Sequence, residues 1–254
     1  MFNALFAVFY REYQIRITNL VWIMFDMLVP LLYLLVFGLA FTRTMGQSFV
    51  VEGQALDYSS FFLGGVLAMA SFGVAMNTSW GWFMDREAGI FYEMLTYPIS
   101  RRQHLLGKVL FNLLLAVVEA LLVLGGAALV LGIPILWARL PLTIAAMLVG
   151  TAGWFFCFSI FSLRIRRNDL YQTILNAIYF VLMFASNMFY PLDPLPEWLK
   201  TMARGNPITW QVDVLRYATI GSGDGRLLAA ECAMFGAFTV AAFLLAARAM
   251  RSQD

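Results

Sequence analysis

Six predominantly apolar stretches lie along the chain, each long enough to cross a lipid bilayer as a helix. A bilayer core about 30 Å thick needs about 20 apolar residues in a helix. The stretches cover residues 20–41, 58–80, 105–131, 141–163, 171–190 and 227–247. They are apolar on every face, unlike the alternating strands of a membrane β-barrel. The pattern predicts an all-α integral membrane protein with six transmembrane helices in a single domain over residues 1–254.

Residues 1–19, ahead of the first apolar stretch, show the 3.6-residue period of an amphipathic helix. One face carries Phe2, Leu5, Phe6, Phe9, Tyr13 and Ile17, and the other carries Asn3, Arg11, Gln14 and Thr18. A secretory signal does not fit, because no basic residue comes first and Arg11, Glu12 and Arg16 occupy the cleavage region. We expect an interfacial helix that acts either as an anchor or as a collar against cytoplasmic partners.

The composition supports a membrane protein. Only 13% of the residues are charged and 61% are apolar, whereas soluble domains are about 25% charged. A soluble protein of this size would be left with large exposed apolar patches. The net charge of +2 is small and the basic residues are scattered, so no nucleic acid partner is expected. The expected surroundings are membrane lipid.

Basic residues are distributed unequally between the two sets of short connections. One set has two, Arg43 and Arg139, and the other has eleven. The eleven are Arg11, Arg16, Arg86, Arg101, Arg102, Lys108, Arg164, Arg166, Arg167, Arg248 and Arg251. Because basic residues favour the cytoplasmic side, we expect a multi-pass protein of the bacterial inner membrane with both termini in the cytoplasm. Four basic residues in the 191–226 segment would lie outside, but long loops follow this rule less strictly.

Two connections are more elaborate than simple loops. Residues 84–98 begin with acidic residues, repeat apolar residues at helical spacing and end at Pro98, which predicts a short amphipathic helix. The alternative is that this helix only rests on lipid. Residues 191–217 are too apolar for a free loop and too interrupted by prolines to span. They predict short re-entrant helices in the outer leaflet, where Trp198, Trp210 and Tyr217 suit an aromatic belt.

Motifs for nucleotide or metal binding are absent from the sequence. Gly107-Lys108 is followed by Val109 and lacks the first glycine of a phosphate-binding loop. There is one histidine, His104, and the two cysteines are far apart in apolar stretches, which gives no metal-site spacing. We therefore expect no cofactor, no metal and no catalytic residue on this chain.

Three carboxylates fall within the predicted spans, where ionisable groups are costly and often functional. Asp26 and Glu231 lie near the ends of the first and sixth spans, where water can reach them. Glu119 falls near the middle of the third span. We expect it to face either a partner helix or a cargo path.

The two patterned connections resemble one known family. Residues 84–108 contain Arg86-Glu87-x-Gly89, followed by Leu95, Pro98, Ser100, Arg101 and Lys108. Residues 191–216 contain Pro191-Leu-x-x-Leu195-Pro196-x-Trp198, then Asn206-Pro207 and Asp213-x-x-Arg216. With the six-span layout, these residues resemble the type-2 exporter permeases of ATP-binding-cassette transporters, over nearly the whole chain.

The resemblance implies a permease that pairs with a second permease, as a homodimer, and with two copies of a separate ATPase subunit that holds ATP and Mg²⁺. It implies that residues 84–98 form the coupling helix that meets the ATPase, through Arg86, Glu87, Gly89, Phe91, Glu93, Leu95, Pro98 and Arg101. It also implies outer re-entrant helices that contain Pro191, Pro196, Trp198, Asn206, Pro207, Asp213 and Arg216. The cargo does not follow from the resemblance.

The spans themselves suggest the kind of cargo. The second, fourth and fifth spans contain no Asp, Glu, Lys or Arg, and a path for a free sugar or ion would need polar lining. We therefore expect an amphiphile, such as a lipid-linked glycan, a lipid or a hydrophobic drug. Candidate path residues are Glu119, Tyr179, Phe180, Met183 and Phe184.

Two other functions would each require a different sequence pattern from that of an exporter. A proton-coupled secondary transporter would usually show internal repeats and broken spans around a midplane site. A membrane enzyme that modifies lipids would need clustered acidic or histidine residues at the interface. The sequence shows neither pattern.

Overall fold

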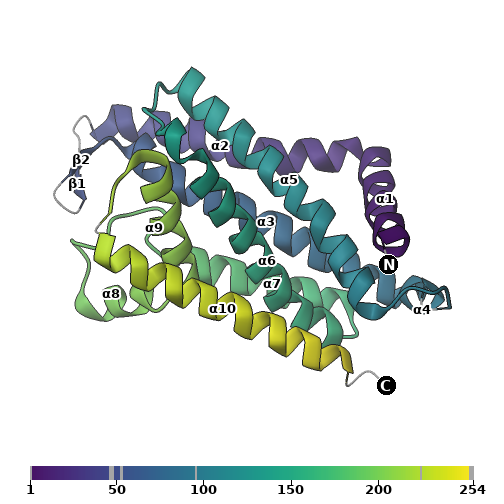
Figure 1. The fold of residues 1–254 in the computed structure, drawn as a ribbon. Helices are drawn as coiled ribbons and strands as arrows, with labels where there is room; N and C mark the ends of the chain where they lie inside the picture. The colour runs from purple at the N-terminus through teal and green to yellow at the C-terminus, as the bar shows by residue number, and fades with distance from the viewer. Residues whose placement is uncertain (1, 46–48, 52–53, 95, 224, 252–254) are drawn as a thin grey trace.

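A computed structural model of the chain describes residues 2–45, 49–51, 54–94, 96–223 and 225–251, most of them in helices (Figure 1). The elements are α1 (Phe2–Thr18), α2 (Leu20–Met45), β1 (Phe49–Val51), β2 (Gln54–Leu56), α3 (Tyr58–Glu87), α4 (Ile90–Met94), α5 (Arg101–Val130), η1 (Trp137–Arg139), α6 (Leu140–Arg164), α7 (Asn168–Phe184), α8 (Glu197–Arg204), α9 (Pro207–Ile220) and α10 (Gly225–Arg251). The predicted all-α membrane fold is confirmed, with one small antiparallel hairpin, β1–β2, in which Phe49 pairs with Leu56.

The long helices run back and forth between two ends of one bundle. Figure 1 shows α4 at one end, close to the start of α1 and the last turn of α10. The hairpin and α8 lie at the opposite end. We call these the α4 end and the α8 end. The start of α1 and the end of α10 thus lie at the same end of the bundle, as the distribution of basic residues predicts.

Polar residues at the helix starts define where the elements begin. The Asp57 side chain accepts a hydrogen bond from the Ser60 backbone N–H at the start of α3. Ser100 and Gln103 form a reciprocal capping box that starts α5 at Arg101, four residues before the predicted span. Each cap satisfies backbone donors that the first turn leaves open.

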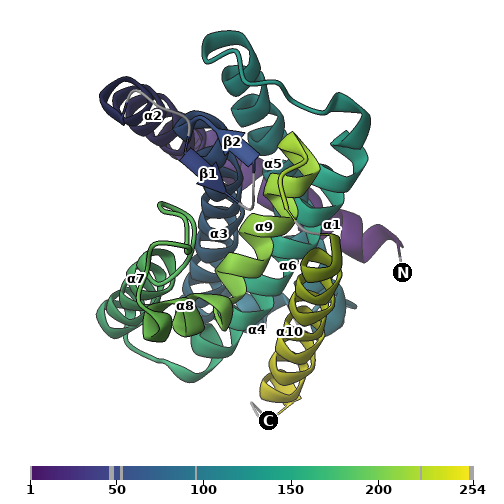
Figure 2. The same cartoon turned by 90° about the vertical axis from the view of Figure 1, so that its left-hand side faces the viewer.

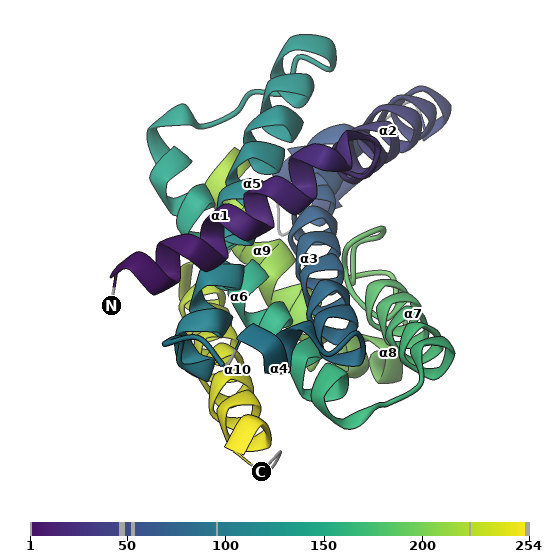
Figure 3. The same cartoon turned by 90° about the vertical axis from the view of Figure 1, so that its right-hand side faces the viewer.

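Helix α3 is the centre of the bundle (Figures 2 and 3). Almost all of its apolar window is buried, and it packs against α2, α5, α6 and α9. Its Phe72 ring contacts Trp154 and Phe158 of α6, each with ring centroids 4.8 Å apart. Helices α2 and α10 lie at the outside and leave most of their apolar side chains exposed, which suits contact with lipid.

Five helices in the described part of the chain are long and apolar enough to cross a membrane. They are Ile23–Phe41, Tyr58–Glu87, Gln103–Val130, Trp137–Arg164 and Gly225–Met250, which overlap five of the six predicted spans. The remaining span was predicted over residues 171–190, but α7 has 17 residues and ends at Phe184. The chain turns there, and the Ser186 hydroxyl donates back to the Met183 carbonyl. Six crossings therefore stay a prediction.

Candidate functional sites at the two ends of the bundle

The segment predicted as one helix over residues 84–98 is two helices in the structure. Helix α3 continues to Glu87, and α4 begins at Ile90 and ends at Met94. Gly89 lies between them with φ of +75°, a left-handed conformation that favours glycine and ends helices. The prediction of a single helix is therefore wrong. The 3.6-residue pattern continues across Gly89 and so hides the change of direction.

Phe91 anchors α4 to the bundle. Its side chain is buried, with ring centroids 5.4 Å from His104 and 6.1 Å from Trp82. The predicted apolar face of this segment thus packs inside the chain at Phe91. The exposed residues of the described part of this segment are Met84, Glu87, Ala88, Tyr92, Glu93, Thr96, Tyr97 and Pro98. Of the other predicted coupling residues, Leu95 and the side chain of Arg101 lie outside the described part.

Arg86 joins the end of α3 to the end of α6. Its guanidinium donates to the carbonyl of Leu163 at 2.5 Å and to the carbonyl of Ile165. Beside it lies a groove of about 570 Å³ lined by Arg86, Glu87, Tyr92, Leu163, Arg164 and Arg166. The α4 end therefore offers an exposed, mostly basic groove next to α4.

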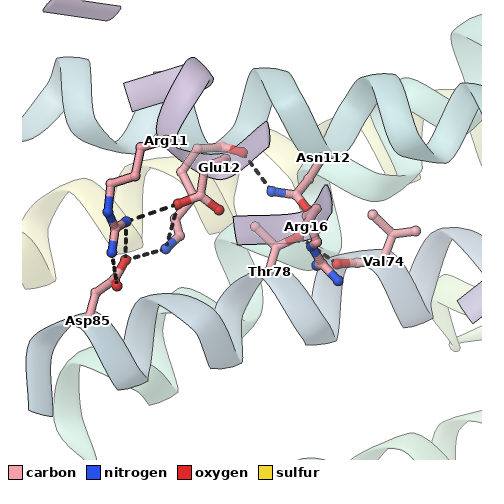
Figure 4. Close-up of polar contacts among 8 residues, drawn as sticks. Arg11, Glu12, Arg16, Val74, Thr78, Asp85 and Asn112 are labelled. Atoms are coloured by element: carbon pink, nitrogen blue, oxygen red, sulfur yellow. Dashed lines mark hydrogen bonds and ion pairs between the residues drawn. The ribbon is translucent and has the colours of Figure 1, made fainter. Parts of the chain in front are cut away.

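A cluster of four charged side chains ties α1 to α3 and α5 (Figure 4). We call Arg11, Glu12, Asp85 and Lys108 the α1 cluster. Lys108 Nζ lies 2.5 Å from Asp85 Oδ2 and 3.2 Å from Glu12 Oε1. Arg11 donates to both oxygens of Asp85, at 3.0 and 2.6 Å. The paired geometry compensates the cost of removing these charges from water.

The α1 cluster shows which side chains of the N-terminal helix face the bundle. Arg11, expected on the polar face, turns toward Asp85, while Phe6, expected on the apolar face, is 65% exposed. Burial acts to lower the pKa of Arg11, but the hydrogen bond and charge of Asp85 outweigh it and raise that pKa. Val8 is buried against Gly107, where an added β-carbon would lie 2.7 Å from Val8 Cβ. The helix therefore docks on α5 through both apolar and charged side chains, including a contact between the Phe9 and Phe111 rings at 5.4 Å.

A second polar group lies deeper between α1, α2, α3 and α5. Arg16 pairs with Asp26 at 3.3 Å and donates to Asn112 at the same distance, and Asn77 donates to Asp26 at 2.9 Å. Glu119 is 3% exposed and lines a hollow of about 10 Å³ beside Arg16 and Asp26. Such a hollow holds about one water molecule. Glu119 thus faces other helices in this conformation.

The four candidate path residues of α7 point in different directions. Met183 is buried in the core, and Tyr179 is partly buried with its ring 5.0 Å from Phe72. Phe180 and Phe184 are more than half exposed and stack on each other at 6.5 Å. The structure therefore does not bring these residues together around one cavity.

At the α8 end, the predicted re-entrant segment forms two short helices. Asn206 caps α9 by accepting from the Ile208 backbone N–H, and Pro207 follows at the first helical position. The Asn206 amide also donates to the Leu182 carbonyl at 2.6 Å, which ties α9 to α7. Trp198 of α8 is 66% exposed. Pro191 and Pro196 belong to the connection before α8.

Asp213 and Arg216 are the centre of another charged group at the α8 end. We call Asn187, Asp213, Arg216 and Glu231 the α9 cluster. Arg216 donates to Asp213 Oδ1 at 2.7 Å and to the carbonyls of Phe61 and Asn187. Asn187 Nδ2 donates to Asp213 Oδ1 at 2.7 Å. Asp213 is also hydrogen-bonded to Glu231 of α10. The cluster therefore connects α3, α9, α10 and the chain after α7.

Sequence reasoning missed most partners in both clusters. Lys108 was noted only as part of a motif, and Asn187, within the predicted fifth span, was not among the candidate site residues. An available signal was the position of Asp85 and Lys108 at the facing ends of two consecutive spans. Within the described residues, no group of three or more His, Cys, Asp and Glu could hold a metal ion.

The fold and its two sites define an all-helical, multi-pass membrane protein with its polar groups concentrated at the two ends and between α1, α2 and α5. Residues 3–220 match the model of the ABC-2 type transporter family, so the chain belongs to this family.

Two algal relatives carry the name "Putative transport permease ycf38". The one from Cyanophora paradoxa is 27% identical over 201 residues, which are 75% of this chain and 65% of the relative. The one from Porphyra purpurea is 25% identical over 197 residues, which are 77% and 66% of the two chains. The chain spans about two thirds of the length of these curated relatives.

Proposed function

We propose that the chain is the transmembrane permease subunit of an ATP-binding-cassette exporter in a bacterial inner membrane. Two copies form a homodimer with six spans each, and α7 is the fifth span. A separate ATPase subunit docks on the α4 end of each copy, which faces the cytoplasm. ATP and Mg²⁺ belong to that subunit, so this chain performs no covalent chemistry.

The observation that carries this proposal is the exposed α4 segment beside the basic groove. Glu87, Tyr92 and Glu93 are accessible, while Phe91 and Arg86 fix the segment to α3, α5 and α6. A partner that pushes on α4 would therefore move α3 directly. Family membership and the meeting of both terminal helices at this end support the same orientation.

The cargo in this proposal is an amphiphile that leaves toward the α8 end. Exposed apolar side chains cover α2, α7 and α10, including Phe25, Phe180 and Val240. Surfaces of this kind suit an acyl or polyprenyl chain, because an unpaired polar group in hydrocarbon costs several kcal/mol. The same exposed apolar surfaces also suit contact with the second permease copy.

Purification of the chain with and without a co-expressed ATPase tests the proposal. We expect ATP hydrolysis only from the complex, and we expect amphiphilic lipids or drugs to stimulate it in nanodiscs. Hydrolysis by the chain alone, or stimulation only by a soluble sugar, amino acid or ion, would contradict the proposal.

A further inference from the structure

Glu119 of α5 is a buried carboxyl group that lacks a partner. It is 3% exposed, and no described residue forms a hydrogen bond or an ion pair with it. Its oxygens keep a small accessible area, unlike fully enclosed unpartnered atoms such as Nε1 of Trp82. Glu119 lines the hollow of about 10 Å³ together with Arg16 and Asp26. The carboxyl group therefore faces a space for about one water molecule.

Glu12 in the α1 cluster is a useful comparison, because it is also a buried glutamate. It is 5% exposed, but its Oε1 lies 3.2 Å from Lys108 Nζ and 3.2 Å from Arg11 Nη1. A buried carboxylate with such partners keeps its charge. A buried carboxylate without them is so costly that the group takes up a proton and becomes neutral. Glu119 is in the second situation.

The charges around the hollow do not balance if both of its carboxyl groups are ionised. Arg16 of α1 is the cation, Asp26 of α2 and Glu119 are the acids, and the other described lining residues are the apolar Ile23, Met27, Val74 and Leu115. No described residue of α6, which also packs against α5, lines the hollow. One arginine thus faces two acids.

Hydrogen bonds indicate which of the two acids keeps its charge. Arg16 pairs with Asp26 at 3.3 Å, and the Asn77 amide donates to Asp26 at 2.9 Å. Both contacts stabilise the ionised form of Asp26. A second negative charge on Glu119 would be repelled across the hollow. The missing positive charge therefore belongs on Glu119.

The size and lining of the hollow determine what supplies this positive charge. A metal ion such as Ca²⁺ or Mg²⁺ needs about six or more oxygen ligands. Such an ion would also lie against the Arg16 guanidinium, which repels it. A proton needs no ligand shell, and it turns the carboxyl group into a hydrogen-bond donor. A proton therefore fits this site and a metal ion does not.

We propose that Glu119 is a proton-binding site, whose carboxyl group holds one proton while α1 and α2 are packed against α5. Its O–H donates to one water molecule in the hollow, and that water donates to the charged Asp26. The Asp26 side chain is 25% exposed, so the proton exchanges with water from this side. Its loss leaves two like charges facing each other and weakens the packing of α2 on α5. The inference goes beyond the export function and needs neither ATP nor cargo.

Infrared spectroscopy of the full chain in ether-lipid nanodiscs, which lack ester carbonyl bands, tests the inference. At about pH 7, the wild-type spectrum minus that of Glu119→Gln should contain the C=O band of one protonated carboxyl group, and this band should shift in D₂O. Glu12→Gln is the matched control. Its difference spectrum should contain carboxylate bands instead, because Glu12 is paired with two cations.

The same band, followed as the pH is raised, tests the role of Asp26. The band should disappear at high pH, and in an Asp26→Asn background it should disappear about one pH unit lower, because the like charge is gone. Thermal unfolding gives a second readout. Glu119→Gln should keep the wild-type midpoint at about pH 7, because glutamine is as neutral as the protonated acid.

Raising the pH to about 9 should lower the midpoint of the wild type more than that of Glu119→Gln. The folded wild type binds one more proton than the unfolded chain, whose glutamates titrate near pH 4.3 in model peptides (about that value), so its stability falls as the pH rises. Carboxylate bands in the Glu119→Gln difference spectrum would overturn the inference. A band that vanishes on addition of Na⁺ or Mg²⁺, or one that Asp26→Asn leaves unshifted, would overturn it too. Since no ATP is used, the result stands or fails separately from the export function.

Discussion

The α1 cluster and the α9 cluster use similar residues but differ in how completely these are paired. Each has an aspartate bound to a buried basic side chain, Asp85 with Lys108 and Asp213 with Arg216. The side chain of Asp85 is 9% exposed and that of Asp213 is 21% exposed. In the α1 cluster every charge has a partner of opposite sign. In the α9 cluster the buried Asn187 Oδ1 has no hydrogen-bond partner among the described residues.

The difference shows how similar ionic groups can serve different purposes. A fully paired cluster fixes the relative positions of helices, because any displacement separates buried charges. The α1 cluster thus makes α1, α3 and α5 one unit near α4. The α9 cluster is less completely paired, because Asn187 Oδ1 has no partner among the described residues and the Asp213 side chain is more exposed than that of Asp85.

Removing the central carboxylate from each cluster should have unequal effects. Asp85→Asn leaves Lys108 and Arg11 with Glu12 alone, and breaking a buried charge pair costs about 3–5 kcal/mol. Asp213→Asn leaves Arg216 bound to the carbonyls of Phe61 and Asn187, and the Asp213 side chain is the more exposed of the two carboxylates, so we expect a loss of about 1–2 kcal/mol. The free energy of unfolding in mixed detergent micelles measures both. A larger loss for Asp213→Asn would reverse the comparison.

A smaller effect is expected where α1 touches α5. Gly107→Ala places a methyl group against Val8 and the Leu5 carbonyl, and such overpacking costs about 1–3 kcal/mol. The control is Gly125→Ala on the same helix, where the added β-carbon meets nothing within 4 Å. The control should be neutral or gain up to about 1 kcal/mol. Equal unfolding midpoints for both variants would show that α1 is not packed as described.

Substitution of exposed acidic residues should leave stability nearly unchanged and should affect only ATPase binding. Glu87→Lys at the α4 end should weaken ATPase binding by about tenfold or less, because a rim charge mainly affects association. Glu197→Lys on α8 is the matched control, since Glu197 is also an exposed acid on a helix. Both variants should insert normally. Binding measured by surface plasmon resonance should change only for Glu87→Lys.

The sequence predicted the helices because uninterrupted apolar stretches and polar caps are local signals. It also identified residues 84–98 and 191–217 as more elaborate than simple loops, since Pro98, Pro191 and Pro196 interrupt the pattern. It did not predict the turn at Gly89 or the end of α7 at Phe184. The first depends on one backbone angle, and the second on a turn that tertiary contacts hold. Nor did it predict that Arg11 faces Asp85, because a helical period identifies two faces without identifying their partners.

In the proposed function, the α4 end meets an ATPase and the α8 end does not. Site-specific photo-crosslinking compares the two ends directly, with benzoylphenylalanine at Tyr92 on α4 or at Trp198 on α8, both of them exposed. After irradiation of intact cells, mass spectrometry should identify an ATP-binding-cassette ATPase in the Tyr92 adduct and none in the Trp198 adduct. An ATPase adduct at Trp198, or no ATPase adduct at Tyr92, would contradict docking of the ATPase at the α4 end.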